Sequence, residues 1–233
     1  MDMSPLWISL KTALAATAVA FILGITVAKA VSAYQGKLRS LLDGILILPL
    51  VLPPTVVGFL LLVLFGRSGP LGQLLALLGT TVIFTWSATV IASAVVAFPL
   101  IYRTALGAFE QVDPDLLDAA RTMGVPERTI FARITVPLAW PGIAAGTILA
   151  FARALGEFGA TLMLAGNIPG KTQTIPLAIF FLVESGQRAR AGIWVLVIIV
   201  ISLVAVTGLQ YWTNHQYQAH APRAKEGKYG SLS

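Results

Sequence analysis

Long apolar runs separated by short polar segments dominate the pattern along this chain. A helix needs about 20 apolar residues to cross the hydrocarbon core of a bilayer. Four runs reach that length, at 6–30, 41–65, 81–106 and 193–212. A fifth run, 134–155, contains Pro137 and Pro141 near its start and Arg153 near its end. The pattern therefore predicts an all-α fold, a polytopic transmembrane helical bundle of about five spans.

The second run holds three prolines, Pro49, Pro53 and Pro54. Proline lacks a backbone donor, so regular helix must be interrupted near the middle of this span. Broken backbone at membrane depth survives only against protein or a water-filled cavity. We therefore expect this span to face the bundle interior, either as a packed kink or as a bend that lines a pathway.

Two rows of small residues recur at four-residue spacing inside the spans. Small side chains let helix backbones approach closely where lipid supplies no hydrophobic driving force. The rows indicate close helix packing, although such rows also arise by chance in spans rich in Ala and Gly. They are Ala16, Ala20, Gly24 and Ala28 in the first span, and Gly142, Gly146, Ala150 and Ala154 in the fifth.

Composition agrees with a membrane protein. Of the 233 residues, 57% are hydrophobic and 11% are charged, and the mean hydropathy is +0.83. These values exclude an ordinary soluble domain and a disordered chain, and a Cys count of 0 excludes a disulfide scaffold.

The net charge of +6 reflects topology rather than binding of nucleic acid, because the cations flank the apolar runs. Of the 16 Lys and Arg residues, ten fall on one side of a five-span arrangement, five fall on the other, and Arg153 lies within a span. The side richer in cations is expected to be cytoplasmic. This places the N-terminus outside and the C-terminal tail inside.

The polar segment 110–133 is the most informative part of the chain, because it holds eight of the 26 charged residues. Asp113-Pro114 is a helix-start signal, with Asp113 as the N-cap and Pro114 as the first helical residue. We predict a short amphipathic helix from there to Gly124, and a second short helix after Val125-Pro126.

The spacing in this segment resembles a known signature. Asp118-Ala119-Ala120, then Gly124, then Ile134, Val136 and Pro137 is similar to the EAA signature, E-A-A-x3-G-x9-I-x-L-P, of membrane-spanning subunits of bacterial ABC importers. Asp118 replaces the usual Glu, and Val136 replaces the usual Leu. The resemblance implies a coupling helix that docks on a cytoplasmic ATPase. Its coupling residues would be Asp118, Ala119, Ala120, Gly124, Ile134 and Pro137; a solvated amphipathic linker is the alternative.

Two further stretches resemble particular branches of this family. LPLVLPPTVVGFLLLVLFGRSGPLG (48–72) looks like the second span of molybdate permease subunits, and ARALGEFGATLMLAGNIPGKTQTIPLAI (152–179) looks like a segment shared by molybdate and sulfate/thiosulfate permeases. The resemblance implies import of molybdate, with tungstate as an accepted analogue. A sulfate/thiosulfate permease is the nearest alternative.

The same resemblance implies partners and a domain organisation. The partners would be a dimer of ABC ATPase subunits, an extracytoplasmic molybdate-binding protein and a second copy of the chain, all at the bacterial inner membrane, with no cofactor. The permease domain would cover 1–215, and the tail 216–233 would be cytoplasmic. Within the domain, the coupling loop would occupy about 107–133 and the extracytoplasmic segment about 157–189. The stretch 174–184 is too short for a span, which predicts an interfacial or re-entrant helix there.

Residues 165–172, AGNIPGKT, satisfy a permissive phosphate-binding pattern. That pattern works only between a buried strand and a helix, whereas here a membrane span precedes it and Pro169 lies inside it. We expect no ATP binding at this loop. ATP hydrolysis would belong to a separate subunit.

Arg153 and Glu157 lie four residues apart and share one helix face near the outer boundary. Together with Pro53 and Pro54 they are candidates for a pathway or outer gate, whereas a local ion pair or interfacial snorkelling is the alternative. No pattern of catalytic or metal-ligating residues is found in the sequence, so we expect neither an enzyme nor a metal site. An ATP-independent secondary transporter would be expected to show inverted repeats and midplane charges, and neither is evident.

Overall fold

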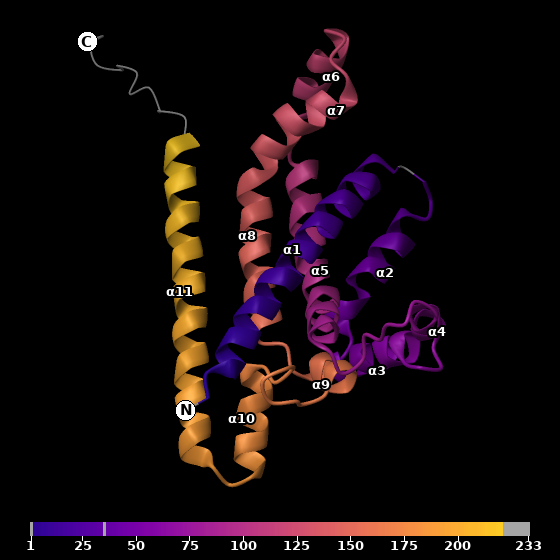
Figure 1. Ribbon diagram of the computed structural model, residues 1–233. Coiled ribbons are helices and arrows are strands. Elements are labelled where there is room, and N and C mark those ends of the chain that lie inside the picture. The colour runs from indigo at the N-terminus through magenta and orange to yellow at the C-terminus, as the bar shows by residue number, and fades with distance from the viewer. Residues whose placement is uncertain (1, 35, 221–233) are drawn as a thin grey trace, which may run out of the picture.

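The computed structural model describes residues 2–34 and 36–220, with side chains described as far as residue 208. The described backbone is built from helices and connecting turns (Figure 1). The helices are α1 (Ser4–Ala33), α2 (Arg39–Val51), α3 (Pro54–Phe65), α4 (Pro70–Leu77), α5 (Trp86–Glu110), α6 (Pro114–Thr122), α7 (Glu127–Ile130), a π-helical turn η1 (Phe131–Thr135), α8 (Val136–Leu155), α9 (Gly159–Ala165), α10 (Ile175–Glu184) and α11 (Arg188–His220).

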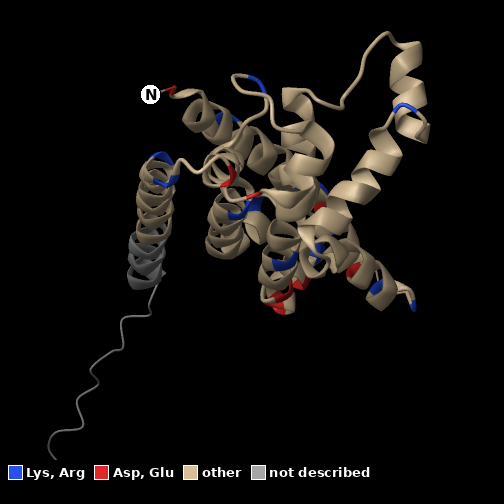
Figure 2. Ribbon diagram, turned by 90° about the horizontal axis from the view of Figure 1, so that it is seen from below, with Lys and Arg blue, Asp and Glu red and all other residues tan. Residues whose placement is uncertain are grey.

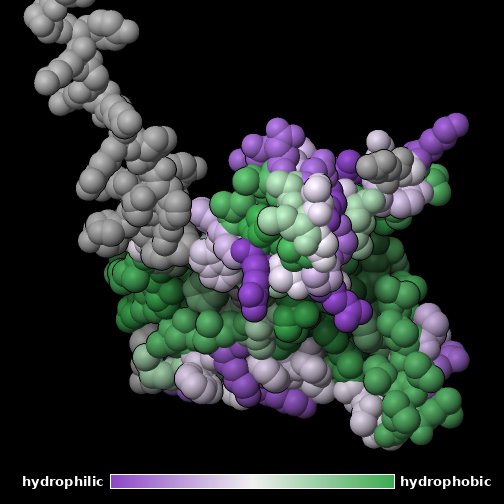
Figure 3. Space-filling view, turned by 90° about the horizontal axis from the view of Figure 1, so that it is seen from above, coloured by the Kyte–Doolittle hydropathy of each residue, from purple (hydrophilic) through white to green (hydrophobic). Residues whose placement is uncertain are grey.

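Four helical stretches are long and apolar enough to cross a membrane, and α2 with α3 forms a fifth span if this pair, bent by 109°, is counted as one. The prediction of an all-helical bundle with about five spans is confirmed. Figure 2 shows that most of the ribbon carries no charged residue. In Figure 3, seen from the α6–α7 end, hydrophilic residues gather over that end and hydrophobic residues surround it.

The start of the third span differs from the prediction. The third span begins at Trp86 rather than at 81, because residues 83–84 form a turn in which Phe84 adopts a φ of +58°. Helix α11 runs to His220, and the division into a permease domain ending at 215 and a tail stays a prediction. Most of the tail predicted at 216–233 lies outside the described residues.

The proline break divides the second span sharply. Leu52 and Pro53 have extended backbone, and the Pro53 carbonyl accepts the amide of Val56 at 2.9 Å, which starts α3. The span as a whole does not face the interior of the described chain, which corrects the sequence-based expectation. Helix α2 has no buried residue, whereas α3 buries Val57, Gly58 and Leu61. The 109° bend accounts for this, because it turns α3 aside and leaves α2 at the edge of the bundle (Figure 1).

Helix α5 lies at the centre, with α1 and α8 packed closely against it. A Cβ atom added at Gly24 of α1 would lie 2.9 Å from Ile101 Cγ2, and one at Gly142 of α8 would lie 2.9 Å from Ala108 Cβ. At Gly146 the added atom would lie 1.8 Å from Thr104 Oγ1. Both small-residue rows therefore mark close packing, as predicted.

The contact at Gly146 yields a test of this packing. Replacing Gly146 by Leu forces α8 away from α5, so we expect a loss of stability of about 1–3 kcal/mol, the usual cost of overpacking. Thermal unfolding of the purified protein in detergent measures this. The control is Gly192→Leu in α11, where an added Cβ meets no atom within 4 Å; equal melting temperatures for the two variants would contradict the packing argument.

Candidate functional site

The hairpin α6–α7 projects from one end of the bundle (Figure 1). Asp113 Oδ1 accepts the amide of Asp115 at 2.9 Å, and Pro114 begins α6, as the sequence predicts. The helix stops where Gly124 adopts a φ of +75°, a conformation that glycine adopts without strain. The amide of Val125 then donates to the carbonyl of Ala120 at 3.1 Å, which closes the last turn. The second short helix follows as α7, also as predicted.

Arg121 joins the two short helices of the hairpin. Its Nη1 donates to Asp118 Oδ1 at 2.7 Å, and its Nε donates to Glu127 Oε1 at 2.6 Å. These hydrogen bonds, first with Glu127 and then with Asp118, raise the pKa of Arg121 above its ordinary value. Sequence reasoning missed Arg121 and Glu127. The available signal was an Arg three residues after Asp118 and six before another acid.

The six predicted coupling residues divide into a tip and a base. At the tip, Asp118, Ala119 and Gly124 are exposed, whereas Ala120 is only 2% exposed and packs within the hairpin. Ile134 and Pro137 lie at the base, in η1 and in the first turn of α8. The first half of the signature, 118–124, therefore lies at the tip of the hairpin, and the second half, Ile134 to Pro137, lies at its base.

The base of the hairpin is a π-helical turn with two aromatic contacts. The amide of Val136 donates to the carbonyl of Phe131, five residues back, directly before Pro137, which has no amide to donate. The ring of Phe131 packs edge-on against Phe109 of α5 at 5.4 Å, and Lys29 Nζ of α1 lies 4.0 Å above the same ring. The base of the hairpin is thus attached to α1, α5 and α8.

A groove of about 750 Å³ lies below the hairpin, between the end of α5 and the start of α8. Its polar lining includes Arg103, Thr104 and Asp113, and Pro137 lies on its wall. Pro137 of the coupling signature and Asp113, which caps α6, therefore line the same groove.

At the opposite end of the bundle, Arg153 and Glu157 form a local ion pair. Arg153 Nη1 donates to Glu157 Oε2 at 2.7 Å, and Glu157 Oε1 accepts the amide of Ala160 at 2.8 Å. The Glu157 side chain is 1% exposed. One carboxylate therefore both neutralises the arginine of α8 and caps the first turn of α9.

The proline break and this ion pair meet at the start of α9. A Cβ at Gly159 would lie 3.1 Å from Pro54 Cβ, and one at Gly58 of α3 would lie 2.7 Å from the Cα of Ala160. The structure thus brings Pro54 against Gly159, two residues after Glu157, although about a hundred residues separate Pro54 from Gly159 in the chain. The sequence offered no pairing signal for Gly58 and Gly159.

The loop 165–172 is a compact turn that follows a helix, α9. Thr172 accepts the amide of Ile168 at 3.0 Å, donates to the carbonyl of Gly166 at 3.3 Å and is fully buried. Its hydroxyl is therefore committed to the loop itself. The predicted short helix at 174–184 is present as α10 (Ile175–Glu184).

Comparison with known proteins relates most of the chain to one family. The family described as "Binding-protein-dependent transport system inner membrane component" matches residues 17–213. The chain is 49% identical over 170 residues to the molybdenum transport system permease protein ModB of Escherichia coli K12, covering 72% of this chain and 74% of that protein. It is 40% identical over 223 residues to ModB of Haemophilus influenzae, covering 94% of this chain and 96% of that protein.

Solved structures share the fold. An inward-facing structure of the MetNI methionine ABC transporter matches with a TM-score of 0.70 at 16% identity, covering 92% of this chain and 94% of that one. At that identity the match concerns the fold alone. From the family match and these relatives we conclude that the chain belongs to the family of binding-protein-dependent transport system inner membrane components.

Proposed function

We propose that this chain is the membrane-spanning permease subunit of an ATP-driven importer for molybdate, with tungstate as an accepted analogue. The observation that carries the proposal is the α6–α7 hairpin, which places the EAA-like residues at one end of a bundle whose ModB relatives are molybdenum permeases at 49% and 40% identity. Two copies of the chain would enclose a shared pathway at the bacterial inner membrane. ATP would be hydrolysed by separate cytoplasmic subunits.

The surface of the hairpin suits a protein partner. Leu116 is 51% exposed and Met123 is 75% exposed, although both lie in a polar segment between two spans. Beside them, Ala119 and Gly124 are small enough to let a partner approach closely. Exposed apolar side chains next to small ones are typical of a docking surface. We assign this surface to the ATPase subunit, with Asp118 and Ala120 supporting it.

The opposite end suits the extracytoplasmic side. Helices α3, α9 and α10 gather there, together with the start of α1 (Figure 1). An extracytoplasmic molybdate-binding protein would dock at this end, and Pro53, Pro54, Arg153 and Glu157 would position the outer gate. The N-terminus would then lie outside, and α11 would end on the cytoplasmic side.

The first test is transport itself. Proteoliposomes that contain this chain, its ATPase and its binding protein should take up labelled molybdate only with internal ATP, and excess sulfate should leave uptake within twofold. Suppression of uptake by sulfate would assign the chain to the sulfate branch. Uptake without ATP would instead identify a secondary transporter.

The second test concerns the hairpin. Gly124→Val places a branched side chain at a φ of +75° where the coupling helix ends, so we expect stimulated ATP hydrolysis and uptake to fall at least tenfold. The matched control is Gly79→Val after α4, where φ is +68° and, as at Gly124, an added Cβ meets no atom within 4 Å. Both variants carry similar local strain. Equal activity in the two would exclude the hairpin tip as the docking site.

A further inference from the structure

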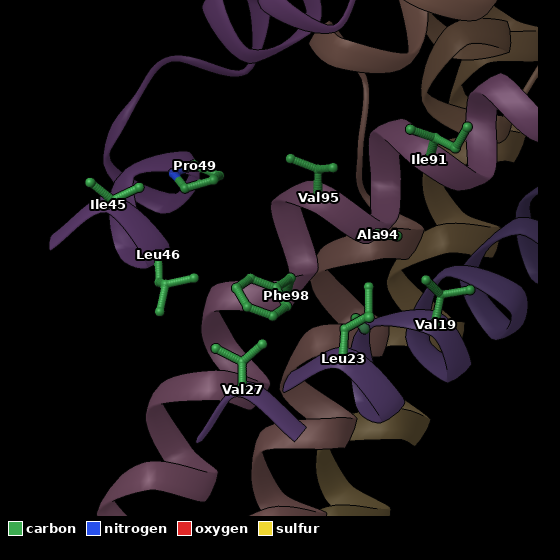
Figure 4. A pocket seen from close by; sticks show the side chains of 11 residues that line it. Val19, Leu23, Val27, Ile45, Leu46, Pro49, Ile91, Ala94, Val95 and Phe98 are labelled. Atoms are coloured by element: carbon green, nitrogen blue, oxygen red, sulfur yellow. The ribbon is translucent and has the colours of Figure 1, made fainter. Parts of the chain in front are cut away.

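Helix α2 packs only loosely: Leu46 and Ile47 contact the cluster around Tyr102, but neither is fully buried. It has no buried residue, and an apolar groove of about 510 Å³ separates its face at Ile45, Leu46 and Pro49 from α1 and α5 (Figure 4). Within a bilayer, apolar side chains gain little by leaving lipid for protein. Apolar packing of this kind does not by itself tie the movement of α2 to that of α5, so the polar contacts of α2 become important.

Two ion pairs connect α2 to α5 at the end that carries the hairpin. Asp43 accepts a hydrogen bond from the Tyr102 hydroxyl at 2.8 Å and another from Arg103 Nη1 at 2.9 Å. Four residues earlier, Arg39 pairs with Glu110 at the last residue of α5. The ring of Tyr102 is fully buried, so its hydroxyl has a fixed direction. An acidic residue near a span end with two directed donors is a specific arrangement rather than a solvated charge.

The end of α5 is shared between α2 and the hairpin. Phe109 packs against Phe131 at the base of the hairpin, and the next residue, Glu110, pairs with Arg39 of α2. A displacement of the hairpin base that moves the end of α5 therefore also pulls on α2.

The α3 part of the broken α2–α3 span lies at the end of the bundle opposite the hairpin (Figure 1). Beyond the proline break, α3 contacts α9 through Gly58 and Gly159, where no larger residue fits without displacement. Helix α9 is in turn capped by Glu157, the partner of Arg153. A continuous series of contacts thus runs from the hairpin through α5, α2 and α3 to α9.

We propose that the pairs Asp43–Arg103 and Arg39–Glu110, with Tyr102, are positioning residues that transmit movement of the hairpin to the outer end through the broken span. We name them the α2–α5 latch. The proposal rests on the proposed function, because the movement arises from ATPase subunits docked on the hairpin. Without the latch, α2 would keep its place in the membrane but would no longer follow α5.

The test uses the complete complex in lipid nanodiscs and compares two distances between the protomers. The chain contains no Cys, so single cysteines at Arg128 in α7 and Leu77 in α4 can be spin-labelled specifically in the purified chain before the complex is assembled. Helix α4 reports on α3, because a Cβ at Gly72 would lie 1.8 Å from the carbonyl oxygen of Gly66. In the native sequence both distances should change when a non-hydrolysable ATP analogue and loaded binding protein are added.

In the variant Arg39→Gln/Asp43→Asn the distance at Arg128 should still change, whereas the change at Leu77 should fall to less than half. Uptake per ATP hydrolysed should fall at least fivefold while basal ATP hydrolysis stays within twofold. The matched control, Lys37→Gln, removes an exposed charge that has no ion-pair partner in the described part of the chain. It should behave like the native protein.

Charge exchange provides a rescue that a purely structural role would not predict. Arg39→Glu alone should uncouple uptake from ATP hydrolysis. The double variant Arg39→Glu/Glu110→Arg should restore uptake per ATP hydrolysed to within twofold of the native value. Because this pair is exposed, both variants test the latch even if the change at Asp43 impairs folding. The latch is overturned if the double variant Arg39→Gln/Asp43→Asn keeps both distance changes and the native ratio. If the native hairpin itself does not move with ATP, the proposed function fails, and the latch fails with it.

Discussion

Close backbone contact of α1 and α8 with α5 is the interaction on which the other features depend. In lipid, helices gain little from the hydrophobic effect when they associate, so van der Waals contact between backbones must hold them together. Gly24, Gly142 and Gly146 provide that contact, because any Cβ there would collide with α5. The three helices pack as one unit, and the α6–α7 hairpin is built directly on the end of α5 and the start of α8.

Prolines lie at two of the places where regular α-helix is interrupted. Pro53 and Pro54 turn the second span by 109°, which sends α3 to the outer end and leaves α2 exposed. Pro137 follows the π-helical turn at the base of the hairpin, where one amide is missing from the ladder. Both breaks join a rigid helix to a segment that would move in a transport cycle. In lipid such irregular backbone persists only because protein covers it, as α9 covers the start of α3.

Pairs of acid and base recur at three of the junctions between these parts. Arg121 joins α6 to α7, Arg153 joins α8 to α9 through Glu157, and Asp43 joins α2 to α5. The more exposed of them, at Arg121 and at Asp43, add little to stability. Their contribution is geometric, since each fixes the direction of one helix relative to the next. The Arg153 pair is the clearest case, because the nearly buried carboxylate also caps α9.

The sequence by itself determined the features that depend on local chemistry. The run lengths predicted the spans, Asp113, Pro114 and Gly124 predicted the limits of α6, and the small-residue rows predicted the packing faces. Each of these signals acts within one helix or one turn, where caps, backbone angles and period are set by neighbouring residues. Only the tertiary structure decided that α3 folds onto α9, that α2 buries no residue, and that Asp43 meets Tyr102. Those contacts join residues 59 or more apart in the chain, and the meeting of such distant groups is set by how whole helices pack, which no local pattern encodes.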